Sequence, residues 1–582
     1  MQKRGLVLAI ILILVLGLSF IIYNYQRNIK LEQSYESKGW KLYKQGKYDE
    51  AIKEFMKYME RNPNNFYAHS GLGWSLYRKG IYDDAVDYFN KAISINQNNY
   101  DPYNGLGWSY FQLALYQDSI KSFEKAIQLN PSYFDPYNGL GWSYYNLNFT
   151  ESYWTSKFDE WLKHFDAAEN AFKNSALLNP KDSSSFIGIG YLYQWKGRKT
   201  NSLADYETSK KAFEKAIEID DKLANAYNGV AWTNYWISRN KPLSLWNFSQ
   251  MIDLFGKAIE LGALDHTAHE GLGLVYLRMG DFNKSLYYFE EALKLAPHHN
   301  HIYTLMAVTY YRLKADYNYG NYSIAIDLFN KALELDPDDI YGLTGLGWTY
   351  NRQGKYNAAI EKFNQVLKFD PNYAESYSGL GFANWKLGNL DLAKEQTQKA
   401  ISLDPYNAIH HEHLGFIYMA LGDLESAEKE FNTSTALGDA DYHIYQGLGY
   451  LNFLKVKYDE AINNYKQSLE KNPRNINVNL MLAFISAQQG KYEQAITYVE
   501  KALEVDNQLP ESYLIYSYVY HKQNDLKSSE LMISKALELS NNPGSLIPSF
   551  PECIAGYQNK YTPGNVADCL NNSIPKGKFL GN

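Results

Sequence analysis

A ten-residue segment occurs twice in this chain, unchanged, at an interval of 34 residues. Residues 101–110 and residues 135–144 both read DPYNGLGWSY. Self-similarity at a fixed period of about 20–50 residues is typical of repeat arrays, in which short helical or strand units stack on their neighbours. The chain has 582 residues, which is too long for one ordinary core. Stacked repeats are therefore predicted to supply a continuous core along its length.

The small residue at the place of Gly107 recurs through most of the chain. It is found at Gly39, Gly73, Gly107, Gly141, Gly190, Ala231, Gly273, Ala307, Gly347, Gly381, Gly415, Gly449, Ala483 and Ser517. Most of the intervals between these positions are again 34 residues. The repeat therefore extends far beyond the two identical copies.

Each repeat predicts two amphipathic helices joined by a turn. The second helix, as in residues 82–96, carries a small residue followed four positions later by an aromatic residue, here Ala85 and Phe89. Small residues at a helix crossing let the two backbones approach, and the ring fills the volume beside them. Proline closes many repeats, as at Pro131, because it cannot continue a helix.

This pattern closely resembles the tetratricopeptide repeat family over residues 32–543, in about fourteen repeats. The resemblance implies an all-α, right-handed superhelical solenoid of helical hairpins. In that fold the first helix of each repeat (the A helix) lines a concave groove, and the second (the B helix) lines the outside. Four longer intervals indicate inserted loops between the A and B helices, near residues 148–165, 198–206, 239–248 and 314–320.

The N-terminus differs from the repeats. Residues 5–23 carry no charge and are long enough to nearly span a bilayer as a helix, and Lys3 and Arg4 precede them. No small-residue cleavage site follows, so residues 1–31 are predicted to form a transmembrane signal anchor and a juxtamembrane segment; a cleaved signal peptide is the alternative. We expect a single-pass membrane protein with most of the chain outside the cytoplasm.

Two features of the sequence fit an extracytoplasmic location. The irregular tail, residues 544–582, holds both cysteines, Cys553 and Cys569, which form a candidate disulfide in an oxidising compartment or two free thiols in a reducing one. Three of the four insertions carry an N-x-[ST] sequence. These candidate N-glycosylation sites are Asn148, Asn247 and Asn321.

Composition and motifs argue against several classes of function. The net charge is −7, from 57 basic and 64 acidic residues, and it gives no electrostatic case for a nucleic-acid partner. GLGWSY matches neither a dinucleotide-binding loop nor a nucleophile elbow. Histidines gather at 266–269, 298–301 and 410–413, but no evident carboxylate or cysteine completes a ligand set. We therefore predict no catalysis, no cofactor and no metal.

The concave face decides what such an array binds. With Gly107 as position 8, the resemblance implies that positions 2, 5, 9, 12 and 13 of the A helix face the groove. In many repeats position 9 is aromatic, position 5 short and polar, and position 13 basic. The basic residues at positions 2 and 5 that clamp a peptide carboxylate in some family members are missing. The candidate groove residues are Trp74, Arg78, Asn104, Trp108, Asn138, Trp142, Asn228, Trp232, Trp348 and Arg352.

The position-9 tryptophans allow two compatible interpretations. In the first they pack, and the bare backbone of a glycine at position 6, such as Gly105, accepts the indole of a neighbouring A helix. In the second they form a stripe of rings that stacks on a ligand. Packing is the simpler interpretation of the two.

The sequence as a whole predicts a non-catalytic, membrane-anchored scaffold that binds a protein or peptide segment in its groove. The basic position 13 favours acidic peptides. The alternative is an extracytoplasmic module that binds a glycan or an envelope polymer, since aromatic rings flanked by amides and guanidinium groups also suit sugars.

Overall fold

The computed structural model describes residues 38–152, 158–239, 241, 245–263, 265–317, 321–437 and 442–540. The predicted anchor at residues 1–31 and the tail at 544–582, with Cys553 and Cys569, lie outside the described residues. Across the described ranges, no helix is both long enough and apolar enough to cross a membrane.

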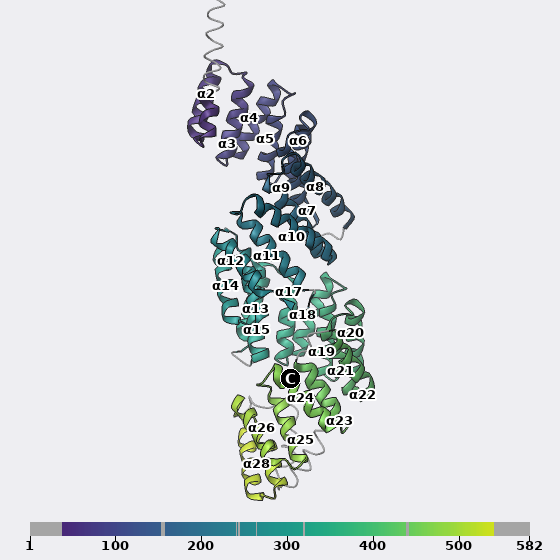
Figure 1. The fold of residues 1–582 in the computed structure, drawn as a ribbon. Coiled ribbons are helices and arrows are strands. Elements are labelled where there is room, and N and C mark those ends of the chain that lie inside the picture. Colours follow the sequence, from purple (N-terminus) through teal and green to yellow (C-terminus); the bar gives the residue numbers. More distant parts are fainter. Residues whose placement is uncertain are drawn as a thin grey trace, which may run out of the picture. The chain divides into compact units, whose positions relative to one another are not determined.

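All regular elements in the described ranges are helices, and they alternate as the A and B helices of successive repeats (Figure 1). The A helices are residues 38–44, α3 (Phe66–Arg78), α5 (Asp101–Gln112), α7 (Phe134–Ser152), α9 (Ser183–Thr200), α11 (Ala224–Arg239), α13 (Thr267–Met279), α15 (Asn300–Tyr317), α17 (Ile340–Arg352), α19 (Ala374–Lys386), α21 (Ala408–Leu421), α23 (Tyr442–Leu454), α25 (Ile476–Gln488) and α27 (Pro510–Lys522). The B helices are α2 (Tyr48–Arg61), α4 (Tyr82–Ile95), α6 (Tyr116–Leu129), α8 (Phe158–Leu178), α10 (Leu203–Ile219), α12 (Phe248–Glu260), α14 (Phe282–Leu295), α16 (Ser323–Leu335), α18 (Tyr356–Phe369), α20 (Leu390–Leu403), α22 (Leu424–Ala436), α24 (Tyr458–Lys471), α26 (Tyr492–Val505) and α28 (Leu526–Ser540).

The helices form two compact units. The first contains the helices up to α11 and nearly all of α12, and the second contains residues 245–248 and the helices from α13 to α28. Within each unit an A helix packs against its own B helix and against the A helix of the next repeat, as α3 packs against both α4 and α5. The turn inside a hairpin commonly contains a glycine with a left-handed backbone, such as Gly80 with a φ of 79°.

The core between two repeats is built around a phenylalanine ring of the B helix. A Cβ atom added at Gly73, in the A helix of the same repeat, would lie less than 3.0 Å from the ring of Phe89. A Cβ atom added at Gly105, in the A helix of the next repeat, would also lie less than 3.0 Å from that ring. The same arrangement of one ring between two glycines occurs at Phe55, Phe123, Phe172, Phe213, Phe363 and Phe431.

This arrangement corrects the expected partner of the position-6 glycines. Gly105 accepts the phenylalanine of the preceding B helix, and not the indole of a neighbouring A helix. The three atoms nearest to a Cβ added at Gly73 or at Gly105 all belong to the Phe89 ring, because the B helix lies against the A helices of two repeats at once. The expectation that glycine allows a close helix contact agrees with this geometry.

The inserted residues differ from the expected loops, because most of them prolong the flanking helices. α7 and α8 have 19 and 21 residues, and α9 and α10 have 18 and 17. Regular B helices such as α4 have 14 residues. Asn148 therefore lies within α7, whereas Asn247 and Asn321 are exposed just before α12 and α16. Prolonged helices keep the backbone amides bonded where a loop would leave them to water.

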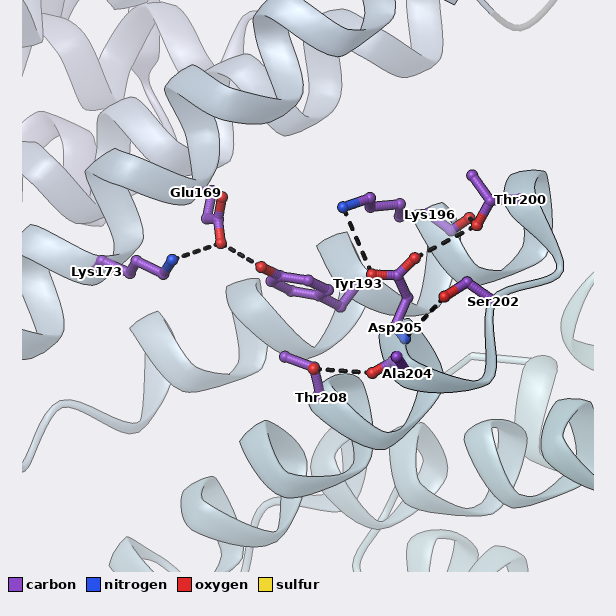
Figure 2. Close-up of polar contacts among 9 residues, drawn as sticks. All are labelled: Glu169, Lys173, Tyr193, Lys196, Thr200, Ser202, Ala204, Asp205 and Thr208. Carbon is purple, nitrogen blue, oxygen red and sulfur yellow. Dashed lines mark hydrogen bonds and ion pairs between the residues drawn. The ribbon is translucent and has the colours of Figure 1, made fainter.

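The end of the second prolonged hairpin is closed by polar contacts (Figure 2). Ser202 caps α10 by accepting a hydrogen bond from the backbone N–H of Asp205 at 3.3 Å. The Asp205 carboxylate accepts a hydrogen bond from Thr200 Oγ1 at 3.4 Å and forms an ion pair with Lys196 at 3.5 Å. These contacts join the last turn of α9 to the first turn of α10.

Candidate functional site

The first compact unit contains a groove on its A helices, with a volume of about 440 Å³. It is formed by residues 38–44, α3, α5 and the first turn of α7, and α5 packs against both α3 and α7. The groove is lined by Trp40, Tyr43, Trp74, Tyr77, Arg78, Asp101, Trp108, Tyr133, Phe134 and Asp135.

Three of the predicted groove residues, Trp74, Arg78 and Trp108, line this groove together. The others do not line it. They are Asn104, Asn138, Trp142, Asn228, Trp232, Trp348 and Arg352. Trp348 and Arg352 belong to α17, in the second compact unit. The sequence-based set is thus divided between positions along the array instead of forming one site.

The position-9 tryptophans pack against the phenylalanine of their own B helix. Trp74 meets Phe89 edge to face, with 5.4 Å between ring centroids and 78° between planes. Trp108 meets Phe123 at 5.3 Å and 79°. The same contact joins Trp142 to Phe172, Trp232 to Phe255 and Trp348 to Phe363. Each indole therefore rests on the B-helix ring of its own repeat, and in all of these repeats except that of Trp232 two glycines enclose this ring.

The indole N–H groups make a second contact, to position 2 of the next repeat. Trp74 Nε1 donates to both carboxylate oxygens of Asp101 at 3.2 Å, and Trp108 Nε1 donates to Asp135 Oδ2 at 3.0 Å. In two further repeats Trp142 Nε1 donates to Ser184 Oγ at 3.2 Å and Trp348 Nε1 donates to Glu375 Oε1 at 2.9 Å. The tryptophan therefore joins consecutive repeats, and only part of its ring faces the groove.

The polar residues at position 5 take part in the same contact between consecutive A helices, which we call the joint. Asn104 Nδ2 donates to Asp135 Oδ2 at 2.7 Å, and Ser70 Oγ donates to Asp101. Asn104 is only 1 % exposed, and Asn138 and Asn228 are also buried. These predicted groove residues are buried and do not line the groove. Asn104 binds a buried carboxylate there, and Asn138 Oδ1 accepts a hydrogen bond from Ser184 Oγ at 3.4 Å.

The carboxyl groups of the joint are buried, and burial raises their pKa values. Burial raises the pKa of Asp101 and of Asp135, while the hydrogen bonds from position 5 and from the indole act in the opposite direction. Burial likewise raises the pKa of Glu375, which accepts from Trp348. The indole and amide donors are therefore what makes an ionised carboxylate tolerable at these positions.

The basic residues at position 13 contact the tyrosine at position 12 of the preceding repeat. Arg78 Nε donates to Tyr43 Oη at 3.4 Å, and Arg352 Nε donates to Tyr311 Oη at 3.3 Å. Arg78 remains partly exposed in the groove, where it is the one cation among the lining residues.

The sequence analysis did not single out the tyrosines or the carboxylates of this groove. Tyr43 and Tyr77 occupy position 12, which the family resemblance already assigns to the concave face. Asp101 and Asp135 occupy position 2, and each lies 27 residues after the tryptophan that binds it. That fixed spacing is readable in the sequence, and the Trp348–Glu375 pair has it too.

Family models match the chain in nine segments, some of which overlap. Residues 347–388 match the model described as TPR repeat. Models described as tetratricopeptide repeat match residues 37–100, 100–133, 185–223, 264–338, 328–361, 374–407, 456–513 and 510–543.

Individual relatives are distant. Superkiller protein 3 of Schizosaccharomyces pombe is 25% identical over 181 residues, which is 30% of this chain and 11% of that protein. Anaphase-promoting complex subunit 3 of the same yeast is 24% identical over 132 residues, which is 23% of this chain and 18% of that protein. The chain therefore spans less than a fifth of the length of these relatives.

A solved structure, the APC/C hetero-tetramer Cut9–Hcn1, aligns with 87% of this chain and 96% of its own, at 16% identity and a TM-score of 0.49. The family matches together cover most of the array, and contacts of the same kind occur in the stretches between them, as at Phe172 and Phe431. The chain belongs to the tetratricopeptide repeat family.

Proposed function

We propose that this chain is a non-catalytic adaptor that holds an extended segment of another protein in the groove formed by the A helices of its first four repeats. The observation that carries the proposal is the groove of about 440 Å³, lined by seven aromatic rings, one arginine and two carboxylates. Ligand sites are mostly apolar concavities with a few placed polar groups, and this lining has that character.

The floor of the groove is rigid before any ligand arrives. Trp74 and Trp108 are each held on one side by a phenylalanine ring and on the other by a carboxylate. Fixed rings lose little conformational entropy on binding, so apolar side chains of a peptide find a prepared surface. The adaptable groups lie around this floor, at Tyr43, Tyr77 and Arg78.

The charges of the groove favour an acidic segment. Asp101 and Asp135 are already occupied by indole, hydroxyl and amide donors. Among the contacts described, Arg78 donates one hydrogen bond, from Nε to Tyr43. The other N–H groups of its guanidinium suit a carboxylate of the bound segment. An aromatic or aliphatic anchor next to an aspartate or glutamate is the expected sequence pattern.

The apolar segment near the N-terminus suggests where the array is located. Residues 5–23 have the length and apolarity of a transmembrane helix, and we propose that they hold the array at a membrane, outside the cytoplasm. A partner would then be captured close to that membrane. Anaphase-promoting complex subunit 3 is by its name a subunit of a larger complex, which agrees with an adaptor role.

The groove is tested by selecting a displayed random-peptide library on the full chain. The wild-type protein should enrich peptides with an acidic residue beside an aromatic or aliphatic one. Arg78→Glu should lose them, because it reverses the cation while leaving the tryptophan floor in place. Lys121→Glu makes the same charge change on α6, where Lys121 is exposed and pairs with Asp118, and it should retain them.

Peptides that bind wild-type and Arg78→Glu protein equally would contradict the groove assignment. If no peptide is enriched but a soluble oligosaccharide quenches the tryptophan fluorescence, the ligand is a glycan and the protein-binding proposal fails. Protease protection in sealed vesicles tests the location in a separate experiment. A protease added outside the vesicles should spare the array only when the array lies inside them.

A further inference from the structure

The second compact unit contains a cluster of histidines around a buried glutamate. His266 and His299 come just before the A helices α13 and α15, whereas Glu270 and His301 lie in the first turns of these two helices. His266 Nε2 is 3.8 Å from Glu270 Oε2, and His301 Nε2 is 3.6 Å from Glu270 Oε1. The His266 and His299 rings are 4.4 Å apart between centroids. We name these four residues the histidine joint.

The repeat geometry explains why these side chains meet. Glu270 occupies position 5 of its repeat and His301 occupies position 2 of the next, the same two positions as Asn104 and Asp135. The chemistry is reversed, because position 5 now holds the carboxylate and position 2 the nitrogen. Position 9 of this repeat is Leu274, so the joint also has no indole donor.

The Glu270 carboxylate completes a ligand set that the sequence did not reveal. One ligand atom from each of His266, Glu270 and His299 lies within 4.8 Å of the other two. Ligand atoms around a tetrahedral zinc ion, at about 2.0–2.2 Å from the metal, are roughly 3.4 Å apart. Small side-chain rotations therefore suffice to bring these atoms into coordination, since two of the three side chains are imidazole rings that precede separate helices.

The electrostatics of the joint favour a cation. The side chain of Glu270 is only 9 % exposed, and a buried carboxylate needs compensating charge. Imidazole and carboxylate together are ligands that zinc accepts.

The other histidine cluster shows a different use of the same residue type. His411 Nδ1 lies 2.6 Å from Glu430 Oε2, and its Nε2 lies 3.2 Å from the carbonyl of Pro405. Both of its ring nitrogens are thus occupied by one structural bridge. His299, by contrast, has a buried Nδ1 with no hydrogen-bond partner. Of the two clusters, only the histidine joint offers three converging ligand atoms among the described residues.

We propose that His266, Glu270 and His299 bind a divalent transition metal, with zinc as the best match, and that His301 or a water molecule takes the fourth position. The ion would connect α13 to the start of α15, at the place where three other pairs of repeats use a tryptophan and a carboxylate. The ion would hold the two repeats together at this joint. The proposed site is open to solvent on the side of His301, whose side chain is 40 % exposed.

The test uses the full chain in detergent, without a polyhistidine tag, and titrates it with Zn²⁺ by calorimetry. We expect one zinc ion per chain. Co²⁺ should give the visible absorption bands of a tetrahedral site. His266→Ala and His299→Ala should each weaken zinc binding by more than the roughly 10–100-fold that loss of an outer-shell residue causes. Glu270→Gln should act in the same direction while preserving side-chain volume.

His298→Ala is the matched control, because His298 is the exposed neighbour of His299 and lies outside the joint. It should bind zinc as the wild type does. Circular dichroism of each variant shows whether the helices remain. Absence of zinc binding by the folded wild-type chain would overturn the proposal, and so would equal binding by the folded His266→Ala and His299→Ala variants.

Discussion

The repeats that begin at residues 100 and 476 solve the same packing problem with opposite residues. In the first, the A helix has Gly107 and the B helix supplies Phe123, whose ring fills the space up to the next A helix. In the second, the A helix has Ala483, the B helix has the small Val499, and the next A helix fills the space with Ile515; all three belong to one core cluster.

The difference teaches that the volume of the joint is kept, and not the residue at any one position. A helical backbone by itself would accept alanine at these positions. Glycine is needed there because the phenylalanine ring fills the space that a Cβ atom would occupy. An intermediate case lies between the two regions. Thr397 takes the place of the ring against Gly381, and the next A helix supplies the bulky His413 at position 6.

The largest expected effect comes from adding one methyl group to a glycine-rich joint. In Gly105→Ala the new Cβ would lie less than 3.0 Å from the Phe89 ring, which Gly73 confines on its other side. We expect a loss of about 2–3 kcal/mol in local stability. A long array does not unfold in one step, so amide hydrogen exchange of peptides from α4 and α5 is the appropriate measurement.

Two further variants sharpen this first prediction. Gly256→Ala adds a methyl group to α12, where nothing lies within 4 Å, and should stabilise the helix by about 0.5–1 kcal/mol. Combining Gly105→Ala with Phe89→Val copies the smaller B-helix residue found at Val499, and should recover part of the loss. If Gly105→Ala were as harmless as Gly256→Ala, the shared-volume explanation would be wrong.

A smaller effect is expected from removing the indole donor while keeping an aromatic ring. Trp108→Phe preserves much of the contact with Phe123 but takes the hydrogen bond away from the Asp135 carboxylate. We expect a loss of about 1.5 kcal/mol, the lower end for a hydrogen bond to a charged group. The pKa of Asp135 should rise further, because the lost N–H was one of the groups that lowered it.

A double-mutant cycle separates this bond from general packing. Asp135→Asn removes the charge, so Trp108→Phe should cost less in its presence than in the wild type. Equal costs in both backgrounds would show that the indole contributes only through its ring. Exchange of the amides in α5 and α7 provides the readout on both sides of the joint.

The smallest effect at neutral pH, and one that grows on acidification, concerns His413. Burial and nearby positive groups lower its pKa from 6.5 to about 3, and its Nδ1 lies 2.9 Å from Ser378 Oγ. Between these two pH values the unfolded segment binds the proton that the folded one excludes, so stability is present above pH 6.5 and is lost as the pH falls. The slope is roughly 1.4 kcal/mol per pH unit.

His413→Asn should remove this slope while keeping a group that can bond to Ser378. Exchange of α19 and α21 at pH 7 and at pH 5 is the comparison to make. The wild type should lose more protection than the variant on acidification. Parallel losses would show that His413 is accessible to protons in the folded state, in conflict with its burial between Trp348 and Phe382.

The sequence predicted the hairpins and the close contacts at glycine, because both depend on a local period that is visible along the chain. It did not identify the ring that fills Gly105, since either the indole or the phenylalanine has a suitable size, and only the stacking of three helices decides between them. The place of Asn104 inside the joint was missed for a related reason. A short amide suits a groove or a buried carboxylate equally well until its partner 31 residues away is known.

The histidine joint shows the same limit more sharply. His266 and Glu270 are close in the sequence, but His299 lies in the next repeat, and no local pattern shows that it comes near them. The relation between position 5 of one repeat and position 2 of the next would have paired Glu270 with His301. That relation follows from stacking and becomes readable in sequence only after one joint, such as Asn104 with Asp135, has been seen.

A ring such as Phe123, enclosed by glycines from two successive repeats, also sets how the array responds to force. Neither repeat can release it alone, so tension applied along the chain is borne by each ring until a whole hairpin detaches. A 34-residue repeat then gives up roughly 110–120 Å of extended chain at once. If the array is tethered at one end and a partner pulls on the other end, we expect it to lengthen in steps of that size.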